Sequence, residues 1–148
     1  MPELHDAAVR ESLKTRLKSL KPDSQRKWGK MSADQMLWHL RSALELAVGR
    51  TSVTPSKAPV PLPQAVLRFA VIKLPWVKGA PTVPQIVAKG EHDFEAERTR
   101  CLQLIDELAQ KDLNGAWPVH PILGTMSGTQ YTQLQAKHLD HHLKQFGA

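Results

Sequence analysis

The prolines of this chain are distributed in a way that restricts what it can fold into. Nine of the eleven prolines lie between residues 55 and 121, and the long stretches on either side are almost free of them. In the proline-poor stretches apolar residues recur every three or four positions, which is the spacing of one face of an α-helix. The alternation of apolar and polar residues that a half-buried strand requires does not occur. The sequence therefore predicts an all-α fold.

We expect four long helices and one short helix. The long helices are predicted near residues 3–20, 32–48, 93–112 and 127–146, and the short helix over residues 64–73. Ser32 with Gln35, and Ser127 with Gln130, have the spacing of capping boxes, in which the two side chains bond the free N–H groups of a first helical turn. These two pairs predict where the second and the last long helix begin.

The third long helix has signals at both of its ends. Asp93 carries a side-chain oxygen suited to an N-cap, and Glu95 and Glu97 place negative charge at the positive end of the helix dipole. Asn114-Gly115 is a turn-forming pair, and we expect it to end this helix.

Residues 50–90 form a proline-rich connection that is long for a small domain. Such a crossover allows the helices that it joins to lie parallel, as in some four-helix bundles. Long connections often cover or build a functional site. We therefore expect residues 55–90, including the short helix, to pack over one end of the bundle and to wall a site.

Length and composition indicate a single domain over residues 1–148. The first six residues have neither a basic region nor an apolar core, so no secretory signal is expected. One cysteine fits a reducing compartment, and a cytoplasmic location is expected. The longest apolar stretch, residues 62–77, is interrupted by prolines and basic residues, so we expect no membrane span.

The formal net charge of +6 would suit an acidic partner or a small anionic substrate. The basic residues are scattered and the four tryptophans are not interleaved with them, which argues against a nucleic-acid groove. We therefore expect a small-molecule substrate, and a homodimer is left open.

Three histidines fall on helix faces that also carry apolar residues. His138 and His142 are four positions apart, so their rings stack one turn apart on one face of the last predicted helix. His39 lies just inside the apolar face of helix 32–48. Buried imidazoles need polar partners, and three of them on two helices can meet at one point as a three-nitrogen metal site. His39, His138 and His142 are therefore the candidate metal ligands.

Two alternatives to this assignment remain open. His141 could replace His142, although His141 lies at the edge of the inward face, and all these histidines could be hydrogen bonded without any metal. The sequence lacks the His-Glu-x-x-His motif of zinc proteases and the Glu-x-x-His pairs of di-iron bundles, which argues against both. Cys101 is interpreted as a core residue.

These residues leave two functional classes. The first is a metal-dependent enzyme that acts on a small molecule, and the second is a non-catalytic helical domain that binds a ligand or partner and has structural histidines. Nitrogen ligands favour zinc, nickel or iron over magnesium or calcium. Neutral ligands leave the charge of the ion uncancelled, so a bound water or thiol would be acidified. No carboxylate is placed by the sequence as a general base.

Four segments of the chain have a distinctive sequence. They read WGKMSADQMLWHL at residues 28–40, APTVP at 80–84, HPILG at 120–124 and HLDHHLKQFG at 138–147. Together they resemble the DinB/YfiT-like superfamily and, more narrowly, a bacterial branch of it. The resemblance covers nearly the whole chain.

The resemblance implies an up-down-down-up four-helix bundle with a long crossover. It also implies a divalent ion held by one histidine of the second helix and two of the last, which by position are His39, His138 and His142. Better-known relatives are thiol S-transferases that use bacillithiol, mycothiol or glutathione, and others are isomerases or hydrolases. The resemblance thus implies S-transferase-like or hydrolase-like chemistry, with a low-molecular-weight thiol as a candidate cofactor.

Overall fold

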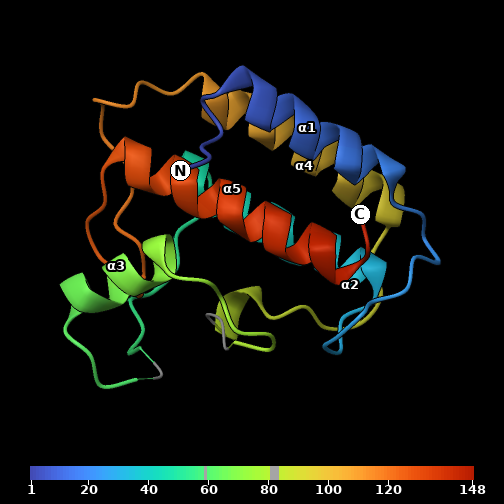
Figure 1. Cartoon of the computed structure of the whole chain (residues 1–148), viewed down its shortest axis with the longest axis horizontal. Helices are drawn as coiled ribbons and strands as arrows, with labels where there is room; N and C mark the ends of the chain where they lie inside the picture. The colour runs from blue at the N-terminus through green and yellow to red at the C-terminus, as the bar shows by residue number, and fades with distance from the viewer. Residues whose placement is uncertain (59, 81–83) are drawn as a thin grey trace.

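The computed structural model describes residues 1–58, 60–80 and 84–148. The elements, in chain order, are α1 (Ala7–Ser19), α2 (Ala33–Val48), α3 (Gln64–Lys73), the short 3-10 helix η1 (Pro84–Ile86), α4 (Phe94–Ala109) and α5 (Gly128–Gln145) (Figure 1). Within these described ranges there is no β-strand, only an isolated bridge between His120 and Gly124. The predicted all-α class is confirmed. None of the helices in the described part of the chain is long and apolar enough to cross a membrane.

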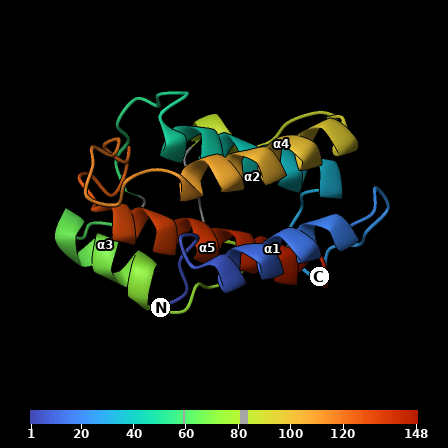
Figure 2. The same ribbon diagram turned by 90° about the horizontal axis from the view of Figure 1, so that it is seen from above.

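The four long helices lie beside one another around a shared apolar core. α2 packs against α4 and α5, and α1 packs against the same two helices. Figure 2 shows α2 and α4 together on one side of the molecule and α1 and α5 together on the other. The helices associate because each has an apolar face that must be removed from water. The largest fully buried side chains include Leu17, Met36, Leu37, Leu40, Leu44, Leu104, Ile105, Leu108, Tyr131 and Leu139.

Charged side chains fix α2 against α4. The Arg41 guanidinium donates from Nε to a carboxylate oxygen of Glu97 at 2.5 Å, and from Nη1 to Glu45 at 3.1 Å. These side chains are mostly buried, so the ion pairs are less screened by solvent than surface pairs. The Arg41–Glu97 pair joins the two helices and favours one register of α2 on α4, whereas Glu45 belongs to α2 itself and holds the guanidinium in place. His39 lies two residues before Arg41.

The predicted helix starts are confirmed for α2, α4 and α5 but not for α1. Both predicted capping boxes are present, at the starts of α2 and α5. The Asp93 carboxylate accepts a hydrogen bond from the backbone N–H of Ala96 at 3.0 Å, as expected for the N-cap of α4. Helix α1 begins at Ala7 rather than at residue 3, because the Asp6 carboxylate accepts from two N–H groups of the first turn and caps the helix there.

The predicted end of α4 is wrong. The helix ends at Ala109, before both residue 112 and the Asn114-Gly115 pair. The backbone N–H groups of Gln110 and Lys111 bond carbonyl groups three residues earlier instead of four, at 3.1 Å each. This tightening ends the α-helical pattern early.

Helix α3 holds the loop that precedes α5. The backbones of His120 and Gly124 exchange two hydrogen bonds and so close a short turn. The side chains of Gln64 and Arg68 donate to carbonyl oxygens within residues 122–125. Gly124 has a φ of 73°, and a Cβ there would lie 2.3 Å from Gln64 Oε1. Glycine therefore suits the positive φ of this turn, and a larger residue would also have to displace the end of the Gln64 side chain.

Helix α3 is also bound to α5 through Lys137. Its ammonium group donates to the carbonyl oxygens of Val71 at 2.7 Å, Ile72 at 3.3 Å and Leu74. Carbonyls at a helix C-terminus have no partner within the helix and attract positive charge. The crossover is thus fastened to α5 immediately before His138.

Candidate metal centre

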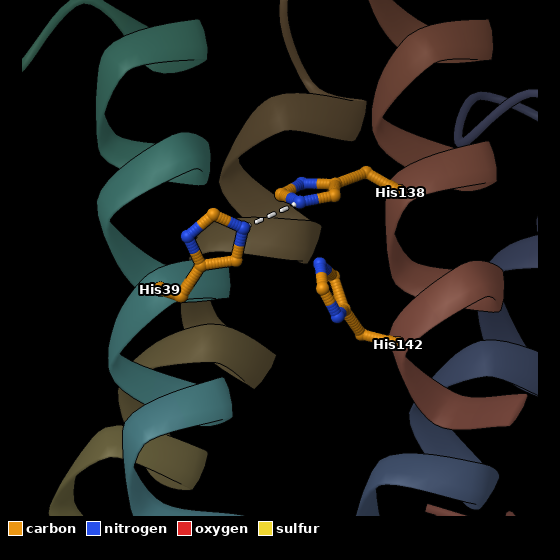
Figure 3. A group of neighbouring side chains, drawn as sticks. All are labelled: His39, His138 and His142. Atoms are coloured by element: carbon orange, nitrogen blue, oxygen red, sulfur yellow. Dashed lines mark hydrogen bonds between the residues drawn. The ribbon is translucent and has the colours of Figure 1, made fainter. Parts of the chain in front are cut away.

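Three histidines from α2 and α5 meet inside the bundle. One ring nitrogen from each of His39, His138 and His142 lies within 4.8 Å of the other two. Nε2 of His39 and Nε2 of His138 are 2.9 Å apart. Figure 3 shows the three rings directed toward a common point between the two helices. The structure therefore brings together the three residues that the sequence singles out.

The helices position these rings by simple geometry. His138 and His142 occupy successive turns of α5, so their rings lie on the same face. His39 faces them from α2, which packs against α5. Residues His39 and His142 are 3% and 8% exposed, and His138 retains partial exposure. The three rings, which we call the histidine trio, are therefore largely removed from solvent.

A backbone carbonyl determines which nitrogen of His39 carries the proton. Nδ1 of His39 lies 2.6 Å from the carbonyl oxygen of Ile86, in η1. A carbonyl oxygen only accepts hydrogen bonds, so the proton of the neutral ring is on Nδ1. Nε2, which faces His138, therefore carries a lone pair.

Gln145 determines the same choice for His142. Gln145 Nε2 donates to the carbonyl oxygen of Trp28 at 2.9 Å, which fixes the orientation of the amide. Its Oε1 then accepts from Nδ1 of His142 at 2.7 Å. The ring proton of His142 is thus on Nδ1, and Nε2, the nitrogen that faces the other two rings in Figure 3, carries a lone pair.

This donor set suits a cation. Two lone pairs, on His39 and His142, are directed into the trio. His138 is the third ring, and as a neutral imidazole it has only one N–H to donate. This N–H can donate a hydrogen bond to the Nε2 of His39 or of His142 but not to both. A single cation, in contrast, can be bound by all three nitrogens.

Burial keeps the trio uncharged. Desolvation lowers the pKa of His39, and it places the pKa of His138 well below its ordinary value, with the neighbouring histidines adding to the effect. Desolvation, reinforced by His39, lowers the pKa of His142 to about 3. The three rings are therefore neutral at pH 7, which is the form that binds a metal.

His141 lies outside the trio. Its ring packs between those of Trp28 and Trp76, with centroid distances of 5.7 Å and 5.3 Å. Its pKa is lowered by burial, against the raising effect of Asp140. His142, and not His141, thus occupies the third position of the trio.

A cavity of about 900 Å³ adjoins the trio, and its wall is mostly apolar. The crossover supplies Leu67, Ala70, Val71, Leu74, Trp76, Val77, Ile86 and Val87. The prediction that residues 55–90 wall the site is confirmed for these side chains, while residues 59 and 81–83 lie outside the described part of the chain. Among the described lining residues there is no Asp or Glu, and Lys30 is the one Lys or Arg.

Three polar side chains of this cavity were not predicted from the sequence to be functional. Gln135 and Gln145 lie three residues before His138 and three after His142, and this helical spacing is the signal that could have found them. His120 lines the same cavity from the loop before α5. Its sequence segment pointed to a family but not to a role for the ring.

The arrangement can be compared with known proteins. A comparison with curated proteins and a comparison with solved structures each found no match to this chain. A family model described as the DinB superfamily matches residues 6–146, which include all three histidines of the trio. The resemblance to the superfamily is thereby confirmed, and the chain belongs to the DinB superfamily.

Proposed function

We propose that this protein binds one divalent metal ion through His39, His138 and His142 and uses it to act on a small molecule. The observation that carries the proposal is the way in which the rings are anchored. The Ile86 carbonyl and the Gln145 amide hold the Nδ1 protons of two rings, so that their Nε2 lone pairs point inward. Metal-binding histidines usually donate their other N–H to a protein oxygen in this way. Membership of the DinB superfamily adds support.

The donor set favours particular ions. Imidazole nitrogens suit zinc, nickel and iron, whereas magnesium and calcium prefer oxygen ligands. When bound, such an ion supplies positive charge that polarises a substrate and favours the deprotonated form of water or of a thiol.

The side chains of the cavity bind and shield the reactants. The apolar wall excludes water, which strengthens electrostatic interactions inside. With no Asp or Glu among the described lining residues, a carboxylate general base is not proposed. The proposed reaction is thiol S-transferase-like, with a low-molecular-weight thiol as co-substrate, or hydrolase-like, with water in the place of the thiol.

The proposal extends to the topology of the chain. The helix pairings and the colour gradients in Figure 2, in which α2 and α4 run together and opposite to α1 and α5, support an up-down-down-up four-helix bundle. Two neighbouring helices that run parallel need a long connection from the end of one to the start of the other, and the crossover between α2 and α4 is such a connection. We treat residues 1–148 as one such domain.

A second candidate is a non-catalytic domain that binds a ligand or partner. It is favoured by the hydrogen bonds already made by the trio, since His39 and His142 bond protein oxygens and His138 lies 2.9 Å from His39. In that case the histidines stabilise the packing of α2 on α5 and need no ion.

Metal analysis of protein purified without a histidine tag tests the proposal. We expect about one ion per chain, either as purified or after reloading with zinc, nickel or iron(II). The variants His39→Ala, His138→Ala and His142→Ala should lose it, because two ligands seldom hold an ion. His141→Ala is the matched control on α5 and should retain it.

The outcomes separate the two candidates. A native helical content with no ion bound under any of these conditions would favour the non-catalytic domain. Bound ion in the wild type and in His141→Ala alone would support the enzyme, and a screen of electrophiles with and without added thiol would then distinguish transfer from hydrolysis.

A further inference from the structure

Gln135 is a buried polar side chain without a hydrogen-bond partner among the residues that the structure describes. It is 4% exposed and lines the cavity beside the trio. Its Oε1 is buried and has no hydrogen-bond partner among the described residues, and its Nε2, the donor of the amide, makes no hydrogen bond to them either. A buried amide without a partner is costly. It lies three residues before His138 on α5, so the two side chains are neighbours.

His120 presents a hydrogen-bond donor to the same cavity. Its Nδ1 accepts from the backbone N–H groups of Ile122 and Leu123, at 3.1 Å and 3.0 Å. The ring proton is therefore on Nε2. Burial lowers the pKa of His120 to about 4, so the ring stays neutral at pH 7. Within the described part of the structure Nε2 makes no hydrogen bond, which leaves it available to a ligand.

His120 and Gln135 lie near successive turns of α5, on the N-terminal side of His138. The ring centroid of His120 lies 6.3 Å from that of Tyr131, on the first turns of α5. Gln135 is one turn further along the helix, and His138 follows it. A molecule bound in this cavity can therefore contact His120 and Gln135 as well as the histidine trio.

The rest of the wall defines what kind of molecule fits. The described lining is mostly aliphatic and aromatic, it has no carboxylate, and its one primary ammonium belongs to Lys30. Such a surface binds apolar groups well but offers no carboxylate to pair with a ligand ammonium. For an oxygen acceptor this wall offers two N–H donors, His120 Nε2 and Gln135 Nε2. Gln135 Oε1 is itself an acceptor and takes no part in such binding.

We propose that His120 and Gln135 form a subsite that binds the carbonyl or carboxylate oxygen of a largely apolar small molecule, seated in the cavity next to the trio. This assignment deepens the proposed function, on which the identification of the molecule as a substrate rests. The subsite itself consists only of side chains and is present whether or not an ion is bound.

Two probes of nearly the same shape test the subsite. 2-Acetylnaphthalene carries an acceptor oxygen that 2-ethylnaphthalene lacks, and both can be measured by equilibrium dialysis. The protein is treated with a chelator, so that no ion takes part. We expect the wild type to bind the ketone about tenfold more tightly, the effect of one or two well-formed hydrogen bonds in a buried site.

Matched variants assign the preference to residues. Gln135→Met removes the amide and keeps the length, and His120→Asn retains an acceptor for the Ile122 and Leu123 N–H groups while it removes the Nε2 donor. Each should bring the ratio of the two dissociation constants close to one. Gln133→Met changes the same residue type on α5, but its side chain lines a different cavity, so the preference should persist.

The proposal is overturned if the wild type binds both probes equally, or if the preference survives in both variants. Loss in only one variant would overturn the role of the other residue. A preference seen only after zinc is added, and unchanged in both variants, would place the oxygen on the ion and also overturn the subsite. Because the decisive measurement uses chelated protein, failure of the metal-content experiment does not alter it.

Discussion

Gln145 connects the trio to the chain segment before α2. Its amide accepts from His142 and donates to the carbonyl of Trp28. We expect Gln145→Leu to weaken zinc binding by roughly 10- to 100-fold, because His142 loses the partner that fixes its ring and its proton. Competition with a fluorescent zinc chelator measures this. Gln145→Glu keeps the acceptor and should lose less, and equal losses in both variants would contradict this role.

His120 makes the stability of the fold depend on pH. Its pKa is about 4 in the folded protein and about 6.5 when unfolded, so the unfolded state takes up a proton first as the pH falls. The stabilisation is complete above pH 6.5 and is lost progressively below it. Between about pH 7.5 and pH 5, His120 should account for a fall of roughly 2 kcal/mol in the free energy of unfolding.

Urea unfolding of chelated protein at the two pH values checks this prediction. His120→Asn should show a smaller fall than the wild type, while some pH dependence persists because the pKa values of the trio are also lowered. Equal falls in the two proteins would show that the ring does not stay neutral in the fold.

The trio could be predicted from the sequence because helical spacing determines which side chains share a face. His39, His138 and His142 stood out as imidazoles on apolar faces of well-capped helices. The groups that orient them could not be predicted. The partner of His39 is the backbone carbonyl of Ile86, which belongs to a distant segment and has no side-chain signature. The role of Gln145 could not be predicted because it depends on the rotamer that its side chain adopts and on where the carbonyl of Trp28 lies in the fold.

At the scale of elements, Lys137 is the main polar link between α3 and α5. Lys137→Met keeps the length of the side chain but removes the donor to the carbonyls of Ile72 and Leu74, while the carbonyl of Val71 keeps its hydrogen bond from Trp76 Nε1. We expect faster hydrogen exchange across residues 64–77, because a helix of ten residues is marginal without tertiary contacts. Exchange in α2 and α4 should be unchanged.

Lys144→Met is the control for this experiment. It removes an ammonium from the same helix, but that group bonds Asp140 on the surface and does not contact α3. If both variants, or neither, accelerate exchange in α3, the link through Lys137 does not hold the crossover.

The elements themselves were predictable to different degrees. Helix α3 spans residues 64–73 as expected, and the capping boxes placed the starts of α2 and α5, since these signals are local. The start of α1 and the end of α4 were not predicted correctly. The helical spacing of apolar residues extends before the start of α1 and past the end of α4. The actual limits are set by the Asp6 cap and by the tightened turn after Ala109, and both depend on local hydrogen bonds that apolar periodicity does not reveal.

At the scale of the whole molecule, Cys101 reports on opening of the core. Its side chain is fully buried, its Sγ donates to the carbonyl of Leu37 at 3.4 Å, and burial raises the pKa of the thiol. We expect no reaction of the native protein with an aromatic disulfide reagent over minutes, because the thiolate is the reactive form. Labelling should rise with urea in parallel with the loss of helical circular dichroism.

Labelling that precedes the loss of helix would show that α4 separates from α2 before the fold is lost. Lys137→Met serves as a second comparison, since it should loosen α3 and leave the labelling of Cys101 unchanged.

Two parts of the chain contribute different kinds of side chain to the cavity. The imidazoles and amides come from α2, α5 and the loop before α5, whereas much of the aliphatic and aromatic wall comes from the crossover. The crossover contributes one hydrogen bond to the trio, from the carbonyl of Ile86, and every residue type provides that group. Changes in crossover sequence can therefore alter the shape of the cavity without altering the histidines, so that new binding preferences can evolve on this scaffold while the histidine trio is inherited intact.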